Sequence, residues 1–384
     1  MRFPETDIIS LIESGCSVPR YDLAESVGPV LQLTALLQPP GSFPLEDIPL
    51  GYATAAGDIR LRETIAERHA VSPDDVVLTV GGMHALFLIA FILCEKGDEA
   101  LTTSPAFPGT RSALEVIVGA NLRTLPLSFD RGYQLDVDEF RSALSPRTKL
   151  VSLASPQNPS GVALAEPTIR NILAAMEEQC PNAHLLLDET YREAAYGTNP
   201  IASSAIALGP KVISVASLSK CHGAPGLRLG WAITRDKALR KQLVIGKFNT
   251  VISCSPVDEA LALRVLAQRD SIINARRIHL AEGLSRVAEW VQRNSDLIEW
   301  VRPDAGALCC LRLTSVFDGE AVGRFYQALA RFGVRVGRGT WFGEEVRIFR
   351  LGFGFLAPSD LEIALEMVTR SLRHAAQQAV EPVS

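Results

Sequence analysis

The stretch SLSKCHGAPGLRLGW, residues 217–231, places one lysine, Lys220, between a strand-like run and a glycine-rich loop. The runs on either side, KVISVAS and RLGWAIT, are short and rich in apolar or β-branched residues, which predicts buried strands. A lysine amine at such a turn can form a Schiff base (imine) with the aldehyde of a cofactor, and an amino acid can exchange into that bond. A lysine on a surface loop explains the spacing equally well.

Further strand-like runs lie upstream, namely VVLTV (76–80), EALTT (99–103), KLVSLAS (149–155) and HLLLDE (184–189). Amphipathic stretches such as AEPTIRNILAAMEEQC separate them, with apolar residues recurring every three or four positions. This alternation predicts an α/β fold, with a mostly parallel sheet wrapped by helices over residues 46–270. A long helix and short strands near 306–313 and 345–353 predict a smaller α+β domain over 271–384, with which residues 1–45 are expected to pack.

Composition and charge narrow the class of protein. The 38 basic and 43 acidic side chains give a net charge of -5, and no basic block is present, so we expect no nucleic-acid partner. The longest apolar run, Ala85–Cys94, is about half of the roughly 20 residues that a membrane span needs, which predicts a buried helix and no membrane partner. The amino terminus does not resemble a secretion signal, so a cytoplasmic location is expected. The seven cysteines form no C-x-x-C pair, which indicates reduced thiols and no metal site.

A carboxylate ends the run HLLLDE. Asp188 would lie at the carboxyl edge of a central parallel strand, where such sheets bind ligands. Beside a pyridine nitrogen, it would keep the ring protonated and electron-withdrawing. Tyr191 could reach the phenolic oxygen of the same ring. A helix-capping role for Asp188 is the structural alternative.

The turn SPQNPSG, residues 155–161, follows the strand KLVSLAS and is expected at the same sheet edge. Asn158 could donate to the phenolic oxygen of the cofactor, and a cis peptide before Pro159 would fix the direction of its side chain. An ordinary turn without a ligand is the alternative.

A phosphate would need donors, and LTVGGMHALFL supplies a glycine pair where a strand passes into an apolar helix. The backbone N–H groups of Gly82 and Met83 would point at the phosphate from the helix start. Ser217, Ser219 and Arg228 would complete this site, the arginine through a charge-assisted bond.

An aromatic ring and an arginine are the remaining candidates. Phe107 could stack on the flat face of the cofactor, although a core position is the simpler interpretation. Arg347 and Arg350 lie three residues apart on a predicted strand, and therefore on opposite faces. Only one of them can enter a cleft, where a guanidinium is suited to anchor the α-carboxylate of an amino acid.

Together and in this order, these motifs resemble the class I/II aminotransferase family, the type I fold of pyridoxal-phosphate enzymes, over roughly residues 45–360. The resemblance implies pyridoxal 5'-phosphate as cofactor, amino-acid and 2-oxo-acid substrates, and catalytic roles for Lys220, Asp188 and Tyr191. Asn158, Asp188, Tyr191, Lys220 and Arg228 match the cofactor residues of the family. Arg350, together with Asn158, is implied to bind the substrate, because it follows the pair Phe342–Gly343 at the spacing the family uses.

The segment GYATAAGDIRLR, residues 51–62, matches a further family pattern. By this resemblance Tyr52 reaches the phosphate bound by the neighbouring subunit, which implies a homodimer with shared active sites.

The chain departs from the family pattern at three places. Ser26 stands in RYDLAESVGP where many members have a substrate-side glycine, so the substrate pocket is expected to be reshaped. Met83 replaces a polar side chain in the phosphate turn. Cys221 and His222 replace the more usual threonine and tyrosine after the lysine, so fewer cofactor contacts are expected.

Transamination is our leading hypothesis for the reaction. A cyclase, lyase or oxidase acting on an arginine derivative is the alternative, because similar motifs occur in relatives such as capreomycidine synthase. A regulatory cofactor sensor would need a DNA-binding module, which this chain lacks. Glu13 and Glu25 could meet a basic substrate side chain, but surface positions are the simpler interpretation.

Overall fold

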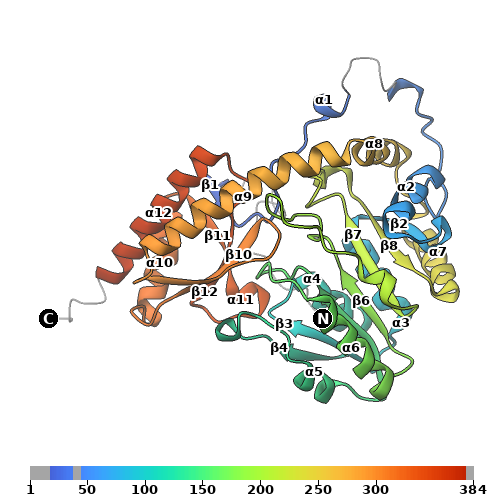
Figure 1. The fold of residues 1–384 in the computed structure, drawn as a ribbon, viewed down its shortest axis with the longest axis horizontal. Helices are drawn as coiled ribbons and strands as arrows, with labels where there is room; N and C mark the ends of the chain where they lie inside the picture. Colours follow the sequence, from blue (N-terminus) through green and yellow to red (C-terminus); the bar gives the residue numbers. More distant parts are fainter. Residues whose placement is uncertain (1–17, 38–44, 378–384) are drawn as a thin grey trace.

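The computed structural model describes residues 18–37 and 45–377, which form two β-sheets with their associated helices (Figure 1). The larger sheet has seven strands in the order β2-β8-β7-β6-β5-β3-β4. Its strands are β2 (Val76–Val80), β3 (Glu99–Ser104), β4 (Asn121–Pro126), β5 (Thr148–Ala154), β6 (His184–Asp188), β7 (Val212–Ser217) and β8 (Leu229–Thr234). All pairs are parallel except those that involve β8, so the predicted mostly parallel sheet is confirmed.

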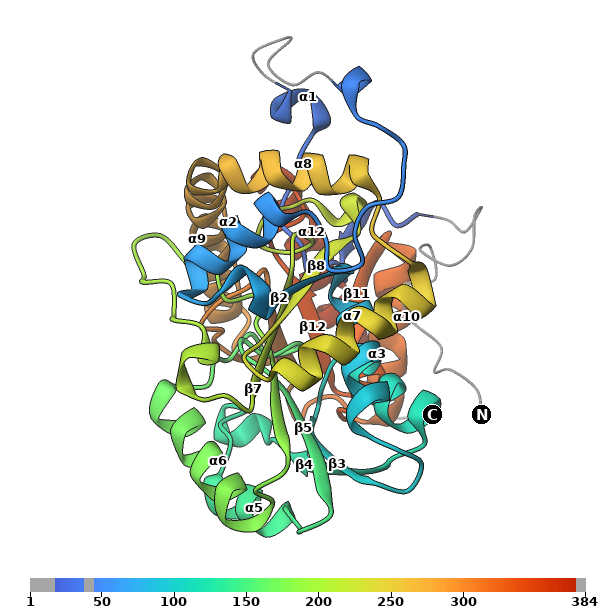
Figure 2. The same ribbon diagram turned by 90° about the vertical axis from the view of Figure 1, so that its right-hand side faces the viewer.

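Both faces of this sheet are covered, because successive side chains of a strand point to opposite faces. On β6, Leu186 packs with α3 and α7, whereas Leu185 and Leu187 pack with α5 and α6. Figure 2 shows these two helix pairs on either side of the sheet. The helices associated with this sheet are α2 (Ile59–His69), α3 (Gly81–Leu93), α4 (Pro108–Arg111), α5 (Val137–Ala143), α6 (Glu166–Gln179), α7 (Lys237–Val251) and α8 (Pro256–Ala267). The apolar run predicted as a buried helix is α3.

The smaller sheet has five strands in the order β1-β11-β12-β10-β9. They are β1 (Tyr21–Leu23), β9 (Ile298–Val301), β10 (Leu308–Leu313), β11 (Val334–Arg338) and β12 (Ile348–Gly352). The remaining helices are α1 (Leu33–Leu36), α9 (Arg269–Arg293), α10 (Gly319–Arg331), α11 (Gly339–Phe342) and α12 (Pro358–Gln377). Because β1 pairs in parallel with β11, the segment that carries β1 is part of this α+β unit.

Helix α9 runs without a break from α8 to the smaller sheet (Figure 1). A boundary between the two sheets and their helices would therefore fall close to the start of α9. The predicted division into domains of residues 46–270 and 271–384 stays a prediction. In the described ranges, no helix combines the length and the apolar character that crossing a membrane requires.

The register of the parallel strands determines where polar side chains meet. Ala154 at the end of β5 pairs with Asp188 at the end of β6, and Asp188 pairs with Val215 near the end of β7. The loops that follow these three strands therefore leave the sheet at the same edge. Asn158, Asp188 and Lys220 are brought together for this reason.

Candidate active site

A cavity of about 870 Å³ lies at this edge, between the larger sheet and β12 of the smaller one. Of the residues predicted for the site, every one except Tyr52 lines it: Gly82, Met83, Phe107, Asn158, Asp188, Tyr191, Ser217, Ser219, Lys220, Arg228 and Arg350. Such a volume suits a cofactor together with a small substrate.

Lys220 is half-buried in the turn that follows β7. Its Nζ donates a hydrogen bond of 3.0 Å to Ser26 Oγ. Burial, and next the positive charge of Arg350, lower the pKa of Lys220 to about 8. A larger fraction of the amine is therefore neutral and nucleophilic near neutral pH than for an exposed lysine.

Asp188 ends β6, and its Oδ1 accepts a hydrogen bond of 2.9 Å from the backbone N–H of Thr190. The bond shapes a turn, and no helix starts there, so the capping alternative is wrong. Burial raises the pKa of Asp188. A cationic ring nitrogen beside this carboxylate would favour its charged form, as the predicted role requires.

Tyr191 is buried, and its hydroxyl donates to Ser26 Oγ at 2.9 Å. Burial raises the pKa of Tyr191 to about 12, so its phenol remains protonated and able to donate at neutral pH. Lys220 and Tyr191 therefore share one hydrogen-bond acceptor.

The glycine turn at the start of α3 has the geometry expected of a phosphate cradle. Gly81 has φ +69°, and Val80 provides no side-chain cap, so the first amides of this helix stay open to a ligand. A Cβ atom on Gly230 would lie 2.6 Å from Gly81 C and 2.7 Å from Gly82 N, so β8 can approach the turn only through a glycine.

Arg228 stands over the same turn, since a Cβ on Gly81 would lie 2.6 Å from its Nη2. Its own backbone is left-handed, with φ +46°, and its Nη1 donates to the Pro225 carbonyl at 3.0 Å. Ser217 Oγ accepts a bond of 3.3 Å from the Ser219 N–H. One guanidinium, two hydroxyls and the helix amides thus face a single end of the cavity.

Arg350 is only 2% exposed although it carries a charge. Its Nη1 donates to Asn158 Oδ1 at 2.8 Å and its Nη2 donates to the Ala24 carbonyl, while its Nε has no partner among the described residues. Burial lowers the pKa of Arg350. Within the described part of the chain no carboxylate forms an ion pair with it, so it can receive an anionic ligand.

Arg347 lies outside the cavity and forms a weak ion pair with Glu345 at 3.4 Å. Arg347 precedes the first residue of β12, so the prediction that both arginines lie on one strand is wrong, and only Arg350, on β12, lines the cavity. Because Asn158 accepts from Arg350 through Oδ1, its amide N–H groups are the donors that a phenolic oxygen would need. The peptide before Pro159 is not cis, so this prediction is wrong; among the described residues the cis bonds are Ser104–Pro105 and Ser155–Pro156.

Phe107 lines the cavity in the loop after β3, with its ring edge-on to Trp341 at a centroid distance of 6.3 Å. Glu25 also lines the cavity, so the surface position that we preferred for it is wrong. Glu13 lies outside the described residues. Tyr52 is 85% exposed and apart from the cavity of its own chain.

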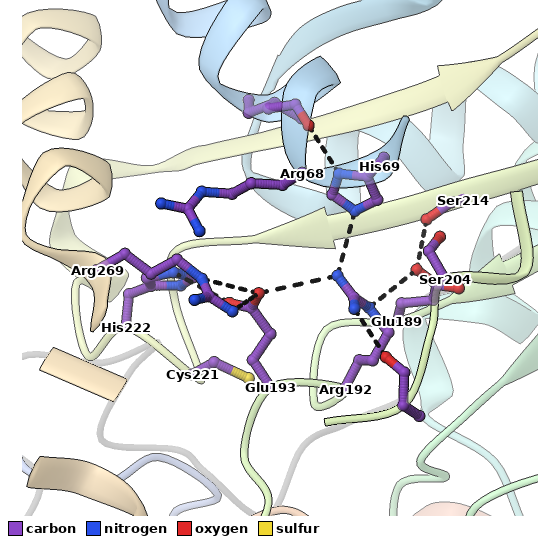
Figure 3. A network of polar contacts seen from close by, with 12 residues as sticks. Arg68, His69, Glu189, Arg192, Glu193, Ser204, Ser214, Cys221, His222 and Arg269 are labelled. Atoms are coloured by element: carbon purple, nitrogen blue, oxygen red, sulfur yellow. Dashed lines mark hydrogen bonds and ion pairs between the residues drawn. The ribbon is translucent and has the colours of Figure 1, made fainter. Parts of the chain in front are cut away.

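Cys221 and His222 do not line the cavity; they belong to a polar network behind the Lys220 turn (Figure 3). Cys221 Sγ donates to the Thr190 carbonyl at 3.0 Å, which joins the Lys220 turn to the Asp188 turn. His222 Nε2 lies 3.3 Å from Glu193 Oε2. Burial lowers the pKa of His222 to about 4, so the ring is neutral.

The same network holds further buried charges. Arg269 pairs with Glu193 at 2.5 Å, and Arg192 pairs with Glu189 at 3.3 Å and contacts His69 Nε2 at 3.2 Å (Figure 3). These contacts fix the segment that carries Asp188 and Tyr191 from behind. The sequence identified Cys221 and His222 as unusual but gave no indication that they face away from the ligand.

The residues present fit pyridoxal 5'-phosphate. The cavity provides open helix amides and a guanidinium for the phosphate, a desolvated carboxylate for the ring nitrogen, and an amine of lowered pKa for the aldehyde. No other part of the described chain combines these groups.

Comparison with known proteins agrees with this geometry. The family model for aminotransferase class I and II matches residues 49–368. Capreomycidine synthase of Streptomyces vinaceus is 32% identical over 333 residues, covering 86% of this chain and 83% of that protein. An aspartate/prephenate aminotransferase of Thermus thermophilus is 27% identical over 344 residues, covering 84% of each.

Among solved structures, a pyridoxal-phosphate-dependent aminotransferase from Streptococcus suis superposes with a TM-score of 0.87 at 23% identity, covering 97% of this chain and 99% of that one. The likeness shows that the fold is shared. Given the family match over most of its length, this chain belongs to the aminotransferase class I and II family and is a pyridoxal-phosphate-dependent enzyme of fold type I.

Proposed function

We propose that the enzyme is an aminotransferase that moves an amino group between an L-amino acid and a 2-oxo acid. The observation that carries this proposal is the buried Arg350, a cation without an ion-pair partner among the described residues, on the same cavity as the Lys220 amine. An arginine so placed favours a substrate with a carboxylate. An amine of lowered pKa favours chemistry at the adjacent α-carbon.

Each residue then has a defined task. The cofactor, when bound, supplies an aldehyde that bonds to amines and a ring that withdraws electrons from the α-carbon. Lys220 would hold the cofactor through Nζ and, once a substrate amine has taken its place, would take the α-proton on Nζ and return it on the cofactor side. The same amine therefore serves as covalent anchor and as base.

Arg350 and Asn158 orient the substrate. A two-pronged bond from Arg350 to the carboxylate fixes which substituent of the α-carbon faces Lys220, and this orientation decides which bond breaks. Asp188 would hold a proton on the ring nitrogen, and the Tyr191 hydroxyl, which donates to Ser26 in the cofactor-free structure, would donate to the phenolic oxygen instead. The phosphate would be bound by Ser217, Ser219, Arg228 and the first amides of α3. Phe107 would provide the aromatic face for the ring.

We further propose a homodimer in which Tyr52 reaches the phosphate site of the partner. The exposed position of Tyr52, on the segment that precedes α2, is compatible with this assignment, because it leaves the side chain accessible to a second copy of the chain.

A cyclase is the second candidate, and the similarity to capreomycidine synthase over most of the chain favours it. Both reactions need Lys220 as base and Arg350 as anchor. They differ in whether the amino group passes to a 2-oxo acid.

A titration of the cofactor-loaded enzyme with single amino acids, without any 2-oxo acid, distinguishes the two. An aminotransferase loses the visible absorbance of its Lys220-bound cofactor stoichiometrically and releases a 2-oxo acid, and a second 2-oxo acid restores the colour. A cyclase accumulates a product that keeps its amino group over many turnovers, and this result would contradict the aminotransferase proposal.

A further inference from the structure

Ser26 is a residue of the cavity wall that the proposed reaction leaves without a role. It follows β1, is 4% exposed and lies between the main cavity and a small adjoining pocket. Its Oγ accepts hydrogen bonds from Lys220 Nζ at 3.0 Å and from Tyr191 at 2.9 Å. Ser26 is therefore the hydrogen-bond acceptor that connects these two residues.

The backbone around Ser26 is held firmly. The Ala24 carbonyl accepts from the buried Arg350, and a Cβ on Gly352 would lie 1.8 Å from the carbonyl oxygen of Glu25. This segment thus lies directly against β12, and the hydroxyl of Ser26 has a fixed position relative to Arg350.

The number of hydrogens on Lys220 Nζ shows whether the contact with Ser26 favours the free lysine or the lysine that is bonded to the cofactor. A serine hydroxyl has two acceptor positions and one hydrogen, and here Lys220 and Tyr191 fill both acceptor positions. An unbonded lysine ammonium has three hydrogens to donate, whereas a nitrogen bonded to the cofactor keeps one at most. The contact therefore stabilises Lys220 when it is free of the cofactor.

We propose that Ser26 is a positioning residue that holds the Lys220 amine whenever the amine is released from the cofactor. The inference rests on the proposed function, in which Lys220 must be released before it removes the α-proton. A lysine has a long flexible stem, so a free amine without a fixed acceptor would spread over many rotamers. Holding it beside the α-carbon raises the fraction that is ready to react.

The test uses O-methylhydroxylamine, a small amine that needs no side-chain pocket. Its nitrogen would replace Lys220 at the aldehyde carbon of the cofactor: the bond to Lys220 breaks as the new carbon–nitrogen bond forms. The two hydrogens of the incoming nitrogen pass to Nζ, so Lys220 leaves as a free amine. The equilibrium is followed by the shift in absorbance of the loaded enzyme. Ser26→Ala and Ser26→Gly are compared with the wild type, because both lack the hydroxyl and neither adds volume.

Two dissociation constants are measured for each variant, one for O-methylhydroxylamine and one for pyridoxal 5'-phosphate, and loss of the Ser26 hydroxyl should change them in opposite directions. Without the hydroxyl, the released amine loses its partner, so the apparent dissociation constant for O-methylhydroxylamine rises about tenfold, the value of one hydrogen bond to a charged group. The affinity of the apoenzyme for pyridoxal 5'-phosphate should increase by a similar factor, because Ser26 stabilises only the unbonded state of Lys220.

A shift of less than about twofold in the first constant for both variants would overturn the inference, and so would a parallel loss of both affinities, which indicates general damage to the site. If the wild-type enzyme forms no covalent bond with pyridoxal 5'-phosphate at all, the proposed function itself fails. The failure of the two proposals can therefore be told apart.

Discussion

Replacement of Arg350 by methionine tests whether this buried cation serves the substrate or the fold. Methionine fills a similar length without charge. Breaking a buried pair between a guanidinium and a carboxylate costs about 3–5 kcal/mol, and every 1.4 kcal/mol is about a factor of ten. We therefore expect kcat/KM to fall by about a hundredfold to a few thousandfold.

Stability should respond far less to this change. The variant loses hydrogen bonds to Asn158 Oδ1 and to the Ala24 carbonyl, each worth about 1–3 kcal/mol as a buried acceptor left unpaired. It also removes a desolvated charge, a gain often of about 1–4 kcal/mol when an apolar residue takes its place. The two losses together are about 2–6 kcal/mol and the gain is about 1–4 kcal/mol, so at the middle of both ranges the free energy of unfolding should fall by about 1–2 kcal/mol.

Arg347→Met is the matched control on the same segment, because Arg347 lies outside the cavity and has only a weak surface ion pair. Its kcat/KM should stay at the wild-type value, measured with the amino acid identified by the titration above. If Arg350→Met keeps its kcat/KM and unfolds much more easily, Arg350 is a structural residue and the assignment of the carboxylate anchor is wrong.

Three further outcomes follow from the same geometry. Asp188→Asn removes the charge that would hold a proton on the cofactor ring. The loss of a buried ion pair costs about 3 kcal/mol or more, so kcat should fall at least a hundredfold, whereas the apoenzyme should unfold no more easily than the wild type. An unchanged kcat would show that Asp188 has no part in the mechanism. Gly230→Ala places a Cβ atom against the backbone of Gly81 and Gly82, so the affinity for the cofactor, measured by spectroscopic titration, should fall about tenfold or more. Gly226→Ala is the control, because Gly226 is exposed and has open space around it, and its affinity for the cofactor should not change. The pKa of Lys220 is lowered to about 8, so the rate at which the apoenzyme bonds to the cofactor should rise with pH and level off above about pH 8 to 9. A rate that still rises in proportion to hydroxide at pH 10 would indicate that Lys220 has the pKa of an exposed lysine.

The pH dependence of stability has a defined sign for the same group. The folded apoenzyme releases the Lys220 proton near pH 8, whereas the unfolded chain keeps it until about pH 10.5. The unfolded state thus binds more protons in this window, so the contribution of Lys220 to stability rises between pH 8 and 10.5.

The core of the larger sheet could be predicted from the sequence because its strands are buried on both faces and therefore appear as continuous apolar runs. Strand β4 was missed, since it lies at the sheet edge, is mostly exposed and contains Arg123. The three-residue β1 was not predicted either, because it is defined by pairing with β11 some 310 residues away, and a local pattern carries no record of such a contact.

The sequence predicted the residues of the candidate site that lie at the ends of the strands, but not those placed there by long-range packing. Asp188 ends one parallel strand, and Asn158 and Lys220 each follow another, so sheet topology brings them to one edge. Ser26 was noticed only as a departure from a family pattern, since its bonds to Tyr191 and Lys220 join residues 165 and 194 positions apart. The position of Glu25 inside the cavity depends on the same long-range packing.

The central claim is that Lys220 is the residue that bonds to pyridoxal 5'-phosphate. Borohydride reduction of the cofactor-loaded enzyme, followed by proteolysis and mass spectrometry, makes this bond permanent and locates it. We predict one modified lysine per chain, in the peptide that contains Lys220, and no stable adduct in Lys220→Ala. Modification of a different lysine, or an equal yield in Lys220→Ala, would contradict the account.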